Sequence, residues 1–276
     1  MFIDKEAIYK SLEWHSSPVD WCEPNYAVVP YIVEYYNTLS NIVFLILPPL
    51  MMYLYRGYAN KINSGIQIVW IFYMIVGASS MYFHGTLSLM GQLLDEISIL
   101  WVYAIAVSLY CPKAYMPPFA RTRTSFSIFI FILNAVFTLL SIWRPYINAF
   151  AQMFLVVIPV VTYLYLELQK IKKTDKEVYK LGMRSMFVGL TAVTIWFNDR
   201  IFCGFYSSFG ITYLHAVWHI LSYIASYTAC VISTYFYVKY EQPKTPCKIS
   251  YWPHKDLRIL GIPYVEIGGK SGKRKI

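Results

Sequence analysis

Long apolar stretches dominate this sequence and limit what it can fold into. Only 14% of the 276 residues are charged, against about 25% in a typical soluble domain. A window of about 20 residues, the length of helix that crosses a bilayer, identifies seven candidate spans. They cover residues 36–55, 65–83, 92–111, 125–143, 148–166, 184–203 and 213–238. The sequence therefore predicts an all-α membrane protein, built as a seven-transmembrane helix bundle.

Basic residues set the expected orientation of this bundle. Most of the 24 Lys and Arg residues lie in the connections after the first, third and fifth spans, or after the seventh. Because basic loops stay on the cytosolic side, we expect a lumenal or extracellular N-terminus and a cytosolic C-terminus. Residues 1–35 then form a lumenal head, 36–240 the bundle and 241–276 a cytosolic basic tail. Topology and attraction to anionic lipid explain the net charge of +9, so no nucleic acid is expected as a partner.

Ionisable side chains lie at matching ends of several spans. In the expected orientation, His84 ends the second span on the outer side and Asp95 begins the third there. His215 and His219 begin the seventh span on that same side. Ionisable groups inside spans are costly and tend to mark functional sites. We therefore expect these groups to meet at one depth of the bundle.

The spacing of these residues favours a zinc centre. His215 and His219 are four residues apart, so on a helix both imidazoles project from one face, about 5–6 Å apart at Cβ. With His84 they would supply three ligands and leave the fourth tetrahedral position to water. Ser80 lies one turn before His84, and Asp95 follows a short turn. Taken singly, each feature also fits a structural role, such as a helix-starting carboxylate or an interfacial histidine.

Acidic and amide side chains gather in the head. Asp20, Glu23, Asn25 and Glu34 lie within fifteen residues and offer hard oxygen ligands of the kind that calcium prefers. The spacing of an EF-hand is absent, so a solvated acidic loop explains the same residues. Both interpretations stay open from the residues alone.

Two cysteines lie on the expected oxidising side of the membrane. Cys22 belongs to the head and Cys203 to the end of the sixth span, whereas Cys247 falls in the cytosolic tail. A disulfide between Cys22 and Cys203 would tie the head to the sixth span.

Several segments together resemble the alkaline ceramidases. They are "VDWCEPNY" with "EYYNTLSN", then "GASSMYFHGTLSLMGQLLDE", "WFNDRIFC" and "YLHAVWHIL". The similarity extends over nearly the whole chain. Members of this family are seven-span intramembrane hydrolases that cut ceramide into sphingosine and a fatty acid. The resemblance implies a membrane-embedded substrate, namely ceramide, dihydroceramide or phytoceramide, and a place in the endoplasmic reticulum or Golgi membrane.

The resemblance also implies a role for each of the residues above. His84, His215 and His219 match the family's zinc ligands. Ser80 matches the serine that helps to hold the substrate carbonyl, and Asp95 matches the carboxylate that takes a proton from water. The family's calcium site matches Asp20, Trp21 (through its carbonyl), Glu23, Asn25 and Glu34. Zn²⁺ and Ca²⁺ are therefore the expected cofactors.

Two other classes of seven-span protein fit part of the pattern. A G-protein-coupled receptor is disfavoured because no D-R-Y follows the third span and no N-P-x-x-Y lies in the seventh. The wider zinc-hydrolase superfamily, with adiponectin-receptor relatives and lipid-anchor remodelling enzymes, shares the serine, aspartate and three histidines. Such a protein would act on a different lipid, and the calcium-type head favours a ceramidase. The ending "KRKI" loosely resembles a dibasic retrieval signal, although a solvated basic tail explains it better.

Overall fold

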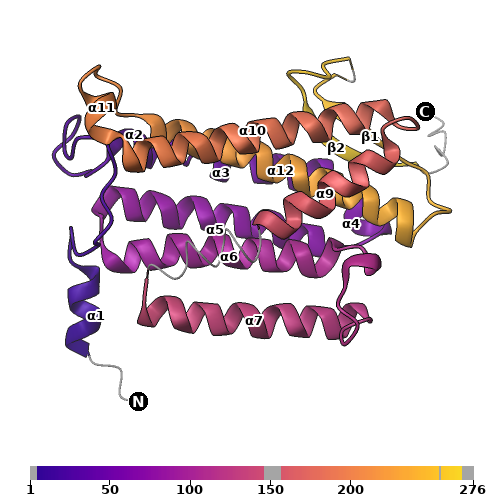
Figure 1. Ribbon diagram of the computed structural model, residues 1–276, viewed down its shortest axis with the longest axis horizontal. Helices are drawn as coiled ribbons and strands as arrows, with labels where there is room; N and C mark the ends of the chain where they lie inside the picture. Colours follow the sequence, from indigo (N-terminus) through magenta and orange to yellow (C-terminus); the bar gives the residue numbers. More distant parts are fainter. Residues whose placement is uncertain (1–4, 146–156, 255, 269–276) are drawn as a thin grey trace, which may run out of the picture.

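The computed structural model describes residues 5–145, 157–254 and 256–268, and its long helices run side by side as a bundle (Figure 1). Within these residues, five segments are long and apolar enough to cross a membrane. They are Tyr35–Leu54, α5 (Gly65–Thr86), α6 (Leu89–Tyr110), α7 (Arg123–Trp143) and α12 (Leu214–Glu241). These correspond to the first, second, third, fourth and seventh expected spans. The prediction of a mostly helical, multi-pass membrane protein is therefore confirmed.

The other two expected spans are not confirmed. The sixth coincides with the second half of α10 (Lys176–Ile201), a helix with charged residues at both ends that is not among the five. The fifth, 148–166, lies partly outside the described residues, and its described part belongs to α9 (Ile158–Ile171). Seven spans and the orientation of the two termini stay predictions.

The first span is broken into two helices, α2 (Tyr35–Ser40) and α3 (Val43–Leu54). Glu23 of the head fixes the start of α2, because its two carboxylate oxygens accept hydrogen bonds from the backbone N–H groups of Tyr36 (2.7 Å) and Asn37 (2.8 Å). Carboxylates are favourable at a helix N-terminus, where backbone donors lack partners. The head is therefore folded onto the bundle through the beginning of its first span. A further short helix, α1 (Lys5–Leu12), precedes it.

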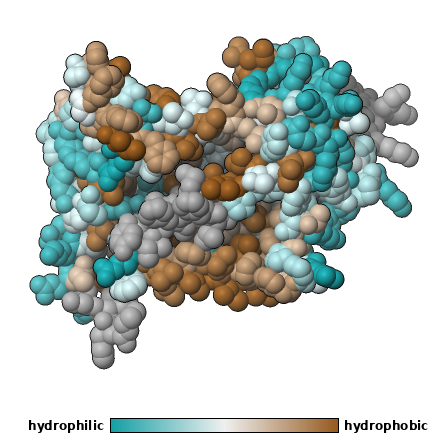
Figure 2. Space-filling view, in the orientation of Figure 1, coloured by the Kyte–Doolittle hydropathy of each residue, from teal (hydrophilic) through white to brown (hydrophobic). Residues whose placement is uncertain are grey.

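Aromatic side chains fill the middle of the bundle. Trp70 of α5, Tyr55 after α3 and Tyr223 of α12 are fully buried, and α5 packs against both α3 and α6. On the outside, large apolar side chains such as Leu139 and Phe187 are exposed, and Figure 2 shows apolar surface across the middle of the molecule. This distribution suits a bundle whose outer surface contacts lipid hydrocarbon.

The segment after α12 folds back onto the bundle. β1 (Cys247–Trp252) and β2 (Ile262–Ile267) form an antiparallel hairpin, which packs against α12 and α4 (Arg56–Lys61). Val265 of β2 is buried in the main core. Over these residues the tail is thus not a solvated extension, and the fold is not purely helical. The "KRKI" ending lies outside the described residues.

Candidate metal centre

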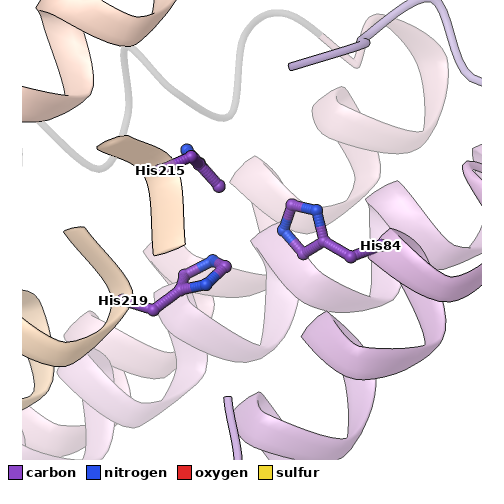
Figure 3. A group of neighbouring side chains, drawn as sticks. All are labelled: His84, His215 and His219. Atoms are coloured by element: carbon purple, nitrogen blue, oxygen red, sulfur yellow. The ribbon is translucent and has the colours of Figure 1, made fainter. Parts of the chain in front are cut away.

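Three histidines meet at the end of the bundle that carries the head. His84 comes from the last turn of α5, whereas His215 and His219 come from the first two turns of α12. One ring nitrogen of each lies within 4.8 Å of the others. The three rings face one another, as Figure 3 shows, and all three side chains are buried. The structure therefore brings together the three residues that the sequence singled out.

Each histidine keeps one ring nitrogen without a partner. His84 Nε2, His215 Nδ1 and His219 Nε2 are buried and accept or donate no hydrogen bond. Buried polar atoms of this kind are rare because they cost free energy. A metal ion held by imidazole nitrogens removes this cost, so the residues present fit a metal centre.

Neighbouring polar groups hold two of these rings in place. His84 Nδ1 lies 2.5 Å from Glu34 Oε2. His219 Nδ1 lies 2.7 Å from Ser40 Oγ and 3.3 Å from Asn41 Nδ2. Such contacts to the second nitrogen fix the orientation of a metal-binding imidazole. The sequence analysis missed Ser40 and Asn41; their signal was polar residues inside an otherwise apolar first span.

The head covers the third histidine. Trp21 stacks on His215 with ring centroids 3.6 Å apart and an angle of 24° between the rings. Trp196 of α10 also contacts Trp21, with ring centroids 5.9 Å apart. The head therefore packs directly on the histidine cluster.

Further contacts tie the head to α10 and α11 (Cys203–Ser207). Cys22 and Cys203 form a disulfide, with their Cα atoms 5.3 Å apart. The Cys22 backbone N–H donates to Asp199 Oδ2 at 3.3 Å, and Arg200 Nη1 donates to the Asp20 carbonyl at 3.0 Å. These links place residues far apart in the sequence around one centre.

A cavity of about 60 Å³ adjoins the histidine cluster. Ser80, Asp95 and His219 line it, and Val76 and Val102 form part of its apolar wall. The Ser80 hydroxyl interacts with the Asp95 carboxyl, whose Oδ1 atom is buried without a partner. The volume is sufficient for a few water molecules, since one needs about 10–15 Å³. The structure thus places a carboxylate, a hydroxyl and room for water beside one of the histidines.

The acidic residues of the head lie next to this centre and take part in several hydrogen bonds. Asp20 Oδ2 accepts from Asn25 Nδ2 at 3.3 Å, and the Asp20 and Glu34 carboxyls interact. Trp21 N–H donates to Glu34 Oε1 at 3.0 Å. Glu23 caps α2, as described above. Among the described residues, one group of three His, Cys, Asp or Glu side chains lies close enough together to hold a metal ion. It consists of His84, His215 and His219.

Burial affects the protonation of these head carboxyls. It raises the pKa of Asp20, with the charge of Glu34 adding to the effect. Burial also raises the pKa of Glu23, and it raises that of Glu34 to about 7. Desolvation disfavours the charged form of each carboxyl, and a bound cation would favour it.

Fold and site together define a multi-pass helical membrane protein with a buried three-histidine centre. Comparison with known proteins places it more closely, since the family model described as Ceramidase matches residues 13–266. The chain is 47% identical over 253 residues to alkaline ceramidase of Drosophila melanogaster, and the matched region covers 91% of this chain and 88% of that protein. It is 42% identical over 258 residues to alkaline ceramidase 1 of Homo sapiens, covering 93% and 96%. This protein belongs to the ceramidase family.

Proposed function

We propose that this protein hydrolyses the amide bond of ceramide, dihydroceramide or phytoceramide at a zinc centre inside the membrane. The products are a sphingoid base and a free fatty acid. One observation carries the proposal: three buried histidines with unpartnered nitrogens form a cluster, and one of them, His219, lines a cavity together with Ser80 and Asp95. The relatives that share the family are named alkaline ceramidases, which supports the choice of substrate.

His84, His215 and His219 would hold the zinc ion. Zinc, when bound, polarises a carbonyl and lowers the pKa of nearby water. Three protein ligands that leave one position open are the pattern of catalytic rather than structural zinc sites. Glu34 and Ser40 hold two of the imidazoles in the orientation that leaves a nitrogen free.

Asp95 is suited to act as the general base and acid. It lines the water-sized cavity, and its Oδ1 atom has no other partner. It accepts a proton from the water that attacks the amide carbon, and it returns a proton to the nitrogen as the C–N bond breaks. The water oxygen stays on the acyl carbon, which leaves as the carboxylic acid.

Ser80 is suited to stabilise the negative charge that develops on the carbonyl oxygen. Its hydroxyl lies in the same cavity and within reach of Asp95. One well-placed donor of this kind is worth roughly 2.7–4 kcal/mol in comparable sites. The apolar wall at Val76 and Val102 keeps the hydrocarbon part of a lipid in an apolar environment.

We also propose that the head binds calcium beside the zinc centre. The ligands would be Asp20, Trp21 (through its carbonyl), Glu23, Asn25 and Glu34. Glu23 and Glu34 are buried in the head, and the Asp20 carboxyl interacts with Glu34; a bound cation would offset the cost of holding these carboxylates close together. Glu23 would have to serve its helix cap as well.

The distribution of basic residues supports a lumenal head and a cytosolic tail. The resemblance to the alkaline ceramidases is the basis for proposing that the seven spans lie in the endoplasmic reticulum or Golgi membrane. The test of function is release of a sphingoid base from ceramide by the purified protein, with and without a zinc chelator. We expect activity to be lost in the chelator and restored by added zinc. Full activity in the chelator contradicts the zinc centre, whereas cleavage of other lipids but not ceramide favours the wider superfamily.

A further inference from the structure

The tip of the C-terminal hairpin, residues 256–261, projects from the bundle and exposes two apolar side chains. Ile259 is 80% exposed and Leu260 86%, among the highest values for large apolar side chains in the described residues. In Figure 1 the tip lies beside α10, and Figure 2 shows apolar side chains standing out at this upper edge, next to a hydrophilic area. Two neighbouring apolar side chains exposed to this extent call for a partner.

The tip is held against α10 by specific contacts. Arg184 Nη1 donates to the backbone carbonyls of Arg258 (3.2 Å) and Ile259 (3.5 Å). The Arg258 side chain forms an ion pair with Glu177, which lies about two turns closer to the start of α10 than Arg184. Gly261 closes the turn, and a Cβ atom there would lie only 2.5 Å from the Leu257 carbonyl oxygen. These contacts therefore fix the position of the hairpin tip relative to α10.

The hairpin tip lies at a boundary on the outer face of α10, between apolar and basic side chains. From Arg184 toward the head, Phe187, Leu190 and Ile201 are exposed, at the spacing of a single helix face. In the other direction, the same face carries the exposed side chain of Lys180. An apolar stripe that gives way to basic residues marks the level where hydrocarbon meets lipid headgroups. Arg184 holds the hairpin tip at this level.

We propose that the hairpin tip is a binding element for anionic lipid. Ile259 and Leu260 enter the outer part of the acyl region, and Lys180 contacts headgroup phosphates. We choose lipid as the partner because the tip adjoins the apolar stripe of α10. The lipid that covers Phe187 and Leu190 also reaches the tip. Lys180 at this level carries the positive charge that a leaflet of anionic lipid attracts. This inference does not rest on the proposed hydrolase activity.

Fluorescence of a labelled tip tests the proposal. Leu260→Cys would be made in a Cys247→Ser background, because Cys111 and Cys230 are buried, and coupled to an environment-sensitive dye. The full chain would be placed in nanodiscs of phosphatidylcholine, with or without phosphatidylserine. Lys244→Cys is the matched control, since Lys244 is exposed in the turn between α12 and β1. We expect the label at 260 to show blue-shifted emission, quenching by brominated lipid and loss of iodide quenching. The label at 244 should show no blue shift, no quenching by brominated lipid and full quenching by iodide.

A second position and a charge variant complete the design. The label at Ile259→Cys should behave like the label at 260, which excludes an effect of one substitution on folding. Phosphatidylserine should increase the blue shift at 260, and Lys180→Gln should reduce that increase while leaving the signal in neutral lipid unchanged. Iodide quenching at 259 and 260 equal to that at 244 overturns the proposal. Protection from iodide without quenching by brominated lipid also overturns it, since a protein would then cover the tip.

Discussion

Glu34 Oε2 lies 2.5 Å from His84 Nδ1, and both side chains are buried. The second oxygen of the same carboxylate accepts the Trp21 N–H of the head. Because the Nδ1 atom is occupied, the Nε2 atom of His84 is the one left without a partner, in the cluster with His215 and His219. One carboxylate therefore connects the head to the histidine centre and sets which nitrogen is offered to a metal.

We expect Glu34→Gln to weaken zinc binding by about 10–100-fold, the usual effect of losing a carboxylate partner of a metal-binding histidine. The glutamine keeps the size of the side chain but not its charge. Competition with a chelator of known zinc affinity measures the change. Glu23→Gln is the control, because Glu23 caps α2 and does not contact a histidine; we expect it to lower the melting temperature with a much smaller effect on zinc. Unchanged zinc affinity in Glu34→Gln contradicts the role of this contact.

His219→Ala should lose most of the bound zinc, since it removes one of three ligands and two remain. Metal analysis of the purified protein measures the zinc content per chain. His254→Ala is the matched control, because His254 is exposed and lies outside the cluster. A full complement of zinc in His219→Ala would show that the ion, if present, is bound elsewhere.

Asp95→Asn should reduce ceramide turnover by about 10²–10⁴-fold, the usual contribution of a positioned acid or base. Zinc should remain, because Asp95 is not one of the three ligands. Glu96→Gln is the internal control. One residue along a helix points about 100° away, and Glu96 Oε1 accepts a hydrogen bond from Gln92 at 2.9 Å. Turnover and zinc content are measured for both variants. Loss of turnover in Glu96→Gln but not in Asp95→Asn would show that the other carboxylate is the base.

Removing calcium should lower the activity or the melting temperature of the wild-type protein, because buried carboxylates of the head would lose their counter-ion. Asp20→Ala should abolish this sensitivity to calcium. Glu13→Ala, at an exposed position of the head, should retain it. The assay compares thermal unfolding with calcium and with a calcium chelator. A wild-type protein that is indifferent to calcium indicates a merely solvated acidic loop.

Sequence patterns with a local cause were predicted well. Apolar stretches such as 65–83 and 125–143 became α5 and α7, because the length of an apolar run alone decides whether it can span a bilayer. The pair His215 and His219 faces one centre, because residues four apart share a helix face. The hairpin of β1 and β2 was missed. Its second strand packs against α4, about 200 residues earlier in the chain, and no local pattern reports such a contact.

The sequence by itself determined the class of protein and the residues of the centre, because hydrophobic length and helical spacing act over a few turns of one segment. Only the tertiary structure decided how those residues are used. It placed Glu23 at the start of α2 and Glu34 against His84, contacts that the sequence did not predict for these two expected calcium ligands. It also placed Ser40 against His219 and the hairpin tip against Arg184. The reason is physical: the choice depends on which groups far apart in the chain are buried together, where every polar atom needs a partner.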